Sequence, residues 1–115
     1  MKIAILGYGK MGKEIEKAAK ARNIEVCSIV DPHSERATHT EISEECLKEA
    51  DVVLDFTHPD SVIENIKKAA ELKKNILVGT TGWYYNLEEV RKIVKSSNIG
   101  FLYSSNFSVG VNVFF

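Results

Sequence analysis

The stretch KIAILGYGKMGKEIEKAAK, residues 2–20, contains the features that decide the fold. A short β-rich apolar run leads directly into three glycines, Gly7, Gly9 and Gly12, and a charged segment follows. In that segment Met11 and Ile15 begin an apolar series with the spacing of one helix face. A strand, a glycine-rich turn and a helix in this order are typical of the first unit of a dinucleotide-binding fold.

Each glycine has a separate expected role in such a turn. One makes a tight turn, one lets the backbone approach a pyrophosphate, and one allows the helix to pack closely on the strand. The N–H groups of the first helical turn and the helix dipole then favour a phosphate anion. Asp31 ends the next strand, where a carboxylate can accept hydrogen bonds from both ribose hydroxyls of an adenosine. A glycine turn with an unrelated surface aspartate is the simpler alternative, and this order of elements disfavours it.

The identity of the dinucleotide depends on the charges around Asp31. A carboxylate repels a 2′-phosphate and therefore favours NADH. His33 and Arg36 in the next loop are within reach of a phosphate, and Lys10 and Lys13 add positive charge nearby. The sequence therefore predicts NADH or NADPH as the cofactor, with NADH slightly favoured.

The rest of the chain alternates strands and helices. Strands are expected at residues 2–6, 24–30, 52–56, 76–78 and 99–103, and helices at residues 10–22, 41–49, 60–73 and around 87–94. Strands that alternate with helices indicate a parallel sheet covered on both faces. We therefore expect an α/β fold, a Rossmann-type doubly wound parallel sheet in a single domain.

Composition limits the classes of partner. The 115 residues suit one core, and a formal net charge of -1 gives no attraction to nucleic acid or to a membrane. No apolar run approaches the roughly 20 residues of a membrane span, and the N-terminus does not resemble a signal peptide. Cys27 and Cys46 stand without metal-ligand spacing, so we expect reduced core thiols and no metal site. These features predict a cytoplasmic protein.

Three segments follow strands at the edge where open parallel sheets bind ligands. They are DFTHP (55–59), GTTGW (79–83) and SSNFSVGVN (104–112). Backbone groups and small hydroxyl side chains of this kind suit a carboxamide, a carboxylate or a ribose. None of the three supplies an obvious general base or nucleophile, which indicates a cofactor-binding half.

The segments GYGKMG, DFTHP, VGTTGW and NFSVGVN, in this order and spacing, closely resemble the dihydrodipicolinate reductase (4-hydroxy-tetrahydrodipicolinate reductase) family. The resemblance covers nearly the whole chain. It implies an NAD(P)H-dependent reductase that transfers hydride to a small cyclic dicarboxylate in the diaminopimelate route to lysine. It also implies a homo-oligomer, a tetramer formed through a second domain.

The resemblance assigns residues by position. The pyrophosphate loop matches Gly7, Gly9, Lys10, Met11 and Gly12. Asp31 matches the acid that holds the adenosine ribose, and Phe56 and Thr57 match the segment that lines the cofactor. Gly79 and Thr81 match the segment at the nicotinamide end, where Thr81 also meets a substrate carboxylate. The loop that holds the carboxamide and begins the hinge matches Ser104, Ser105, Asn106 and Phe107.

One departure from the family pattern bears on catalysis. The family's substrate domain carries an E-x-H-H-x-x-K-x-D-x-P-S-G-T segment with the proton-donor histidine, and no such segment occurs here. We therefore expect a dinucleotide-binding domain at residues 1–103, the start of a hinge at residues 104–115, no substrate domain and no catalytic residue. His33 and His39 are expected in loops, whereas contact of His58 with the nicotinamide or a phosphate stays open. Trp83, Tyr84 and Tyr85 are expected to be packing or interface residues rather than cofactor contacts.

Two other functions remain open on the sequence alone. One is a non-catalytic NAD-sensing regulatory module with the same fold, because fold does not fix function. The other is the first domain of an aspartate- or homoserine-type dehydrogenase. The GTTG and NFSVGVN segments favour the reductase, because a sensor does not need donors beside the nicotinamide.

Overall fold

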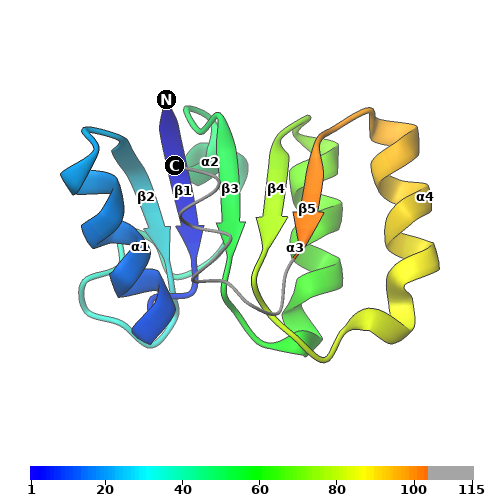
Figure 1. Ribbon diagram of the computed structural model, residues 1–115, viewed down its shortest axis with the longest axis horizontal. Helices are drawn as coiled ribbons and strands as arrows, with labels where there is room; N and C mark the ends of the chain where they lie inside the picture. The colour runs from blue at the N-terminus through cyan, green and yellow to red at the C-terminus, as the bar shows by residue number, and fades with distance from the viewer. Residues whose placement is uncertain (104–115) are drawn as a thin grey trace.

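The strands form where short runs of aliphatic residues occur, and they make a single parallel sheet (Figure 1). The computed structural model describes residues 1–103. The strands are β1 (Lys2–Leu6), β2 (Glu25–Val30), β3 (Val52–Asp55), β4 (Asn75–Val78) and β5 (Phe101–Tyr103). Their order across the sheet is β2-β1-β3-β4-β5, and every neighbouring pair is parallel. The arrows of Figure 1 therefore all point to one edge.

Helices cover both faces of the sheet and divide the core in two. They are α1 (Lys10–Ala21), α2 (Glu44–Leu47), α3 (Pro59–Glu71) and α4 (Leu87–Ser97), with a short 3-10 helix η1 (Tyr84–Asn86) before α4. Ile15 and Ala19 of α1 pack with Ile3 and Ile5 on one face. The apolar side chains of α2, α3 and α4 pack on the other face. The predicted fold class, a doubly wound parallel sheet, is confirmed.

The crossover from β2 to β3 passes from one side of β1 to the other. Strand β1 itself pairs with β2 on one side and with β3 on the other side. At the carboxyl ends of β1 and β3 the chain therefore leaves the sheet toward opposite faces, to α1 and to α3 (Figure 1). Such a switch point is where ligands bind in open α/β sheets.

The largest difference from the expected elements is α2, which was predicted at residues 41–49 but spans Glu44–Leu47. The Ser43 side chain caps its N-terminus by accepting from the Cys46 N–H at 3.3 Å. At the other end Lys74 Nζ donates to the carbonyl oxygens of Lys48 (2.9 Å) and Ala50 (3.0 Å). Lys74 thus satisfies two carbonyls of the turn in which the chain leaves α2 and enters β3.

The two cysteines are free thiols, as predicted, with Cys46 buried and Cys27 partly buried. Within residues 1–103 no helix is long and apolar enough to cross a bilayer. The expected hinge at residues 104–115, with the expected site residues Ser104, Ser105 and Phe107, lies outside the described residues.

Candidate functional site

The carboxyl ends of four neighbouring strands bring the predicted site segments together. Gly7 and Gly9 follow β1, Asp31 follows β2, and the DFTHP and GTTGW segments follow β3 and β4. All of them lie at the edge toward which the strands point in Figure 1. The structure therefore brings the predicted segments of residues 1–103 to one edge of the sheet.

Gly7 makes the turn that closes one side of the site. Its φ is 89°, in the left-handed region that side chains rarely adopt, and its N–H donates to the Val30 carbonyl at 2.8 Å. A Cβ atom at this position would lie 2.6 Å from the Phe56 carbonyl oxygen. The turn after β1 is thus pressed against the loop after β3, and only glycine fits between them.

Gly12 and Gly9 have contrasting surroundings. A Cβ at Gly12 would overlap the Gly7 carbonyl oxygen, so this glycine lets α1 approach the turn. A Cβ at Gly9 would meet no atom within 4 Å, although Gly9 is the N-cap of α1 and has an extended backbone. The protein itself therefore does not explain a glycine at position 9. The open backbone at a helix N-terminus fits the close approach of a pyrophosphate.

Asp31 presents an anchored carboxylate beside this turn. Its Oδ2 accepts from the Tyr8 N–H and its Oδ1 from the His33 N–H, both at 2.7 Å. Burial alone would raise the pKa of this carboxyl, but the two N–H donors and the nearby His33 and His58 hold the pKa below its ordinary value. Each oxygen of a carboxylate accepts two hydrogen bonds, so both keep capacity for ribose hydroxyls.

The basic residues around Asp31 are partly engaged already. The Arg36 guanidinium lies 3.7 Å from Glu16 and 5.9 Å from the centre of the Tyr8 ring. Lys13 Nζ lies 5.7 Å from that same ring, and the Tyr8 hydroxyl donates to Glu16. These contacts hold Arg36 and Lys13 near the expected adenosine end of the site.

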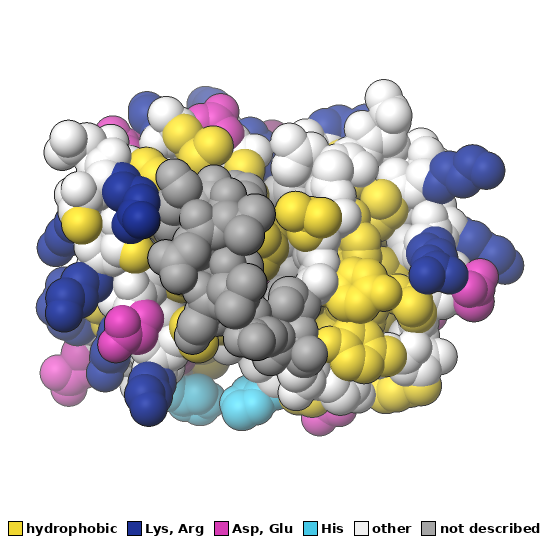
Figure 2. Space-filling view, in the orientation of Figure 1, with side chains coloured by type: hydrophobic (Ala, Val, Ile, Leu, Met, Phe, Trp, Pro, Cys, Tyr) yellow, Lys and Arg dark blue, Asp and Glu magenta, His cyan; other side chains and the backbone are white. Residues whose placement is uncertain are grey.

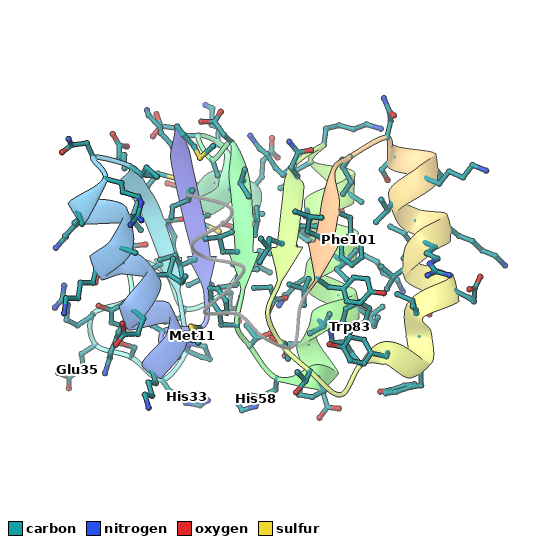
Figure 3. The ribbon with its side chains drawn as sticks, viewed as in Figure 1. Met11, His33, Glu35, His58, Trp83 and Phe101 are labelled. Carbon is teal, nitrogen blue, oxygen red and sulfur yellow. The ribbon has the colours of Figure 1, made fainter. Side chains whose placement is uncertain are left out.

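Two of the three histidines lie at this edge. His33 and His58 are both exposed and are labelled close together in Figure 3, and histidine side chains reach the surface there in Figure 2. Both lie near enough to Asp31 to lower its pKa. His39 lies further along the loop, where its Nδ1 is 2.8 Å from Thr38 Oγ1. Among residues 1–103 no group of three or more His, Cys, Asp or Glu side chains could hold a metal ion.

The loop after β4 combines one buried and one exposed threonine. Thr80 is buried, whereas Thr81 is exposed at the same edge. Trp83 is fully buried, and its indole N–H donates to the Thr80 carbonyl at 2.6 Å. The Trp83 ring packs on Tyr84, Phe101 and Tyr103 at centroid distances of 5.0–6.0 Å. In the structure Trp83 therefore packs in the core, in line with the expectation from the sequence.

The structure adds Asp55, which sequence reasoning did not select. This carboxylate at the end of β3 is completely buried, and burial raises its pKa above the ordinary value. It accepts hydrogen bonds from Thr57, Asn65 and Thr80. The available signal was an acidic residue at the end of an apolar run with threonine two positions later, a pattern in which the side chain caps its own loop.

Comparisons with known proteins agree with this geometry. Residues 1–107 match the family described as dihydrodipicolinate reductase, N-terminus. A 4-hydroxy-tetrahydrodipicolinate reductase from Christiangramia forsetii is 37% identical over 115 residues, which make up 100% of this chain and 46% of the relative. The chain thus spans about half the length of that curated relative.

Two solved structures share the fold. A dipicolinate-bound dihydrodipicolinate reductase from Paenisporosarcina superposes with a TM-score of 0.77 at 23% identity, over 96% of this chain and 49% of that one. A hyperthermophilic archaeal homoserine dehydrogenase in complex with NADPH gives a TM-score of 0.71 at 16% identity, over 90% and 43% of the two chains. At these identities the likeness shows the fold alone.

Proposed function

The chain belongs to the family of dihydrodipicolinate reductase N-terminal domains, and on that premise we propose that it is the NAD(P)H-binding half of a 4-hydroxy-tetrahydrodipicolinate reductase. The observation that carries the proposal is the open backbone at Gly9, at the N-terminus of α1 and beside the anchored Asp31 carboxylate. That combination provides N–H donors for a pyrophosphate and acceptors for a ribose at one edge of the sheet.

The residues have distinct roles in this proposal. The N–H groups at Gly9, Lys10 and Met11 bind the pyrophosphate, and Gly7 and Gly12 give the turn its shape. Asp31 accepts from the ribose hydroxyls of the adenosine. The segment Phe56–Thr57 lines the cofactor, and Gly79 and Thr81 face the nicotinamide end, where the exposed Thr81 hydroxyl also meets a carboxylate of the substrate.

The chemistry of the reaction comes from the cofactor, which supplies hydride from its dihydronicotinamide ring to the cyclic unsaturated dicarboxylate. The chain's own residues fix where that ring sits, which replaces a diffusional encounter by a positioned one. The proton donor, most substrate contacts and the contacts of a homo-oligomer are proposed to come from the other half of a reductase of the relatives' length. The proposed location is the cytoplasm.

NADH is the slightly favoured cofactor in this proposal. The Asp31 carboxylate is held ionised by two N–H donors, so a 2′-phosphate beside it meets a fixed negative charge. Arg36 offsets this in part, although its guanidinium is shared with Glu16. Both dinucleotides should therefore bind, with NADH at least as tight as NADPH.

Family membership favours the reductase over the two other functions considered. A regulatory module needs no donors at the nicotinamide end, whereas the family that matches residues 1–107 is named for a reductase. The homoserine dehydrogenase likeness rests on fold at 16% identity and carries no argument for that activity.

A titration of the chain with NADH and NADPH in a calorimeter tests the proposal. The wild type should bind both, and Gly9→Val should place a branched side chain in the space of the pyrophosphate. We expect NADH to bind the variant at least about tenfold more weakly, a loss of about 1.4 kcal/mol. The far-ultraviolet circular dichroism should be unchanged, because a Cβ at Gly9 meets no protein atom. The absence of dinucleotide binding, or equal binding by the folded variant, would overturn the proposal.

A further inference from the structure

Asp55 is a buried carboxylate that lies among neutral hydrogen-bond donors. Its side chain is 0% exposed at the carboxyl end of β3, and no ion pair joins it to a lysine, arginine or histidine among residues 1–103. Burying a charge without a cation is costly, and an apolar side chain of similar size would avoid that cost. The hydrogen bonds that the carboxylate accepts should therefore explain why a charged residue stands at this position.

The carboxylate binds three segments at once. Its Oδ1 accepts from the Thr57 N–H at 2.9 Å, from the Thr57 hydroxyl at 2.7 Å and from the Thr80 hydroxyl at 3.3 Å. Its Oδ2 accepts from Asn65 Nδ2 of α3 at 3.0 Å. The loop after β3, the first half of α3 and the loop after β4 are thus fixed to one side chain.

The network extends beyond the carboxylate to the rest of the β4 loop. The Thr80 hydroxyl also lies 3.2 Å from the Thr57 carbonyl oxygen, and the Thr80 carbonyl accepts from the buried indole of Trp83. Every buried side-chain nitrogen and oxygen atom described in residues 1–103 has a hydrogen-bond partner. A fully satisfied buried network of this kind holds its members in one geometry.

The partners of Asp55 lie on one half of the site. Thr57 lies in the segment after β3 that is expected to line the cofactor, and Asn65 lies on α3. Thr80 lies in the loop after β4 that carries the expected nicotinamide end. The expected adenosine and pyrophosphate contacts, at Asp31 and Gly9, belong to β1, β2 and α1 and make no bond to the Asp55 side chain. Phe56, which the Gly7 turn contacts, is held by its own N–H bond to the Leu6 carbonyl at 2.8 Å. Removal of the carboxylate should therefore disturb the nicotinamide end much more than the pyrophosphate end.

We propose that Asp55 is a positioning residue for the nicotinamide end: its buried carboxylate holds the loops that follow β3 and β4 in the relative position that receives the reactive ring. This inference rests on the proposed function, because it assigns a cause to the geometry of that same site. Asp55 itself does not touch the cofactor. It acts through Thr57 and through the loop that contains Thr80 and Thr81.

Two ligands separate this role from a general loss of stability. ADP contains the adenine, one ribose and both phosphates, whereas NADH adds the second ribose and the dihydronicotinamide. In Asp55→Ala, NADH should bind at least about fivefold more weakly, whereas the affinity for ADP should change by less than about twofold. A merely structural role would weaken both ligands by the same factor.

A conservative variant and a matched control complete the design. Asp55→Asn keeps an oxygen for Thr57 and Thr80, and the Asn65 amide can turn to offer its oxygen to the new NH₂ group, so NADH affinity should be restored to within about twofold. Ser28→Ala also removes a buried hydrogen-bonding group, the 2.6 Å bond from Ser28 Oγ to the Cys46 carbonyl, but far from the β4 loop. This control should leave both ligand affinities unchanged.

Thr80→Val covers the case in which Asp55→Ala does not fold. It replaces the hydroxyl that joins the β4 loop to Asp55 and to the Thr57 carbonyl with a methyl group and keeps the rest of the side chain. It should weaken NADH about threefold or more and leave ADP unchanged. Equal losses for both ligands in the folded variants, or no loss for NADH, would overturn the inference. Failure of the wild type to bind either ligand would instead overturn the proposed function.

Discussion

The contact between Gly7 and the loop after β3 leads to a quantitative prediction for Gly7→Ala. Two separate costs act at this residue. Its φ of 89° is unfavourable for alanine by about 1.5 kcal/mol. The added Cβ would also stand 2.6 Å from the Phe56 carbonyl oxygen. The backbone at Gly7 or at Phe56 must therefore move before these two atoms reach an acceptable distance.

The second cost is of the overpacking kind. Such cases cost about 1–3 kcal/mol, and Phe56 cannot move freely because its N–H is bonded to the Leu6 carbonyl at 2.8 Å. The two terms together predict a loss of about 3 kcal/mol in the free energy of unfolding. For a chain of this size that loss corresponds to a decrease of roughly 12 °C in Tm.

Gly82→Ala is the matched control for the first cost. Its φ is 85°, nearly the same as that of Gly7, but the nearest atom to a new Cβ is Pro59 Cγ at 3.1 Å, in a side chain that can adjust. This variant should lose only the backbone term, about 1.5 kcal/mol. Urea unfolding followed by circular dichroism measures both variants. If Gly7→Ala is no less stable than Gly82→Ala, the contact with Phe56 contributes nothing and the reasoning is refuted.

Two further predictions concern the carboxylates. Asp31→Ala should lose the ribose acceptors for NADH and remove the charge that opposes a 2′-phosphate, so the ratio of affinities should shift toward NADPH in calorimetry; an unchanged ratio would show that Asp31 does not face the ribose. Burial raises the pKa of Asp55 above its ordinary value of 3.8, so ionising it costs free energy only in the folded state. The wild type should therefore lose stability relative to Asp55→Asn as the pH rises above about 3.8, and a stability difference that is constant across a series of urea titrations at rising pH would contradict the assignment.

The fold could be predicted from the sequence because its signals are local. The apolar runs of β1, β3 and β4 and the spacing of apolar residues in α1 and α3 each specify one element. Alternation of these elements then leaves few topologies, since crossovers between parallel strands are right-handed. The boundaries were less predictable: α2 is shorter than expected, and the turn that follows it is bonded to Lys74, which is far away in the sequence.

The site was predictable where a backbone requirement selects the residue type. A glycine is visible in a sequence, and so is an acid at the end of a strand. The surroundings of these glycines were not predictable. Gly9 faces open space whereas Gly7 contacts Phe56, and this difference depends on how two distant loops meet. The role of Asp55 was missed for the same reason, because two of its partners, Asn65 and Thr80, lie 10 and 25 residues away.

The parallel strand order also has a consequence for the kinetics of folding. Among residues 1–103 no two neighbouring strands are joined by a hairpin, so each pairing closes a long loop. The candidate site at their carboxyl ends is complete only once β1, β2, β3 and β4 have all assembled. A transition state that lacks part of this sheet has no complete site for a dinucleotide. The bound nucleotide would therefore slow unfolding and leave the rate of folding unchanged. It would stabilise the folded protein without helping the chain to reach that state.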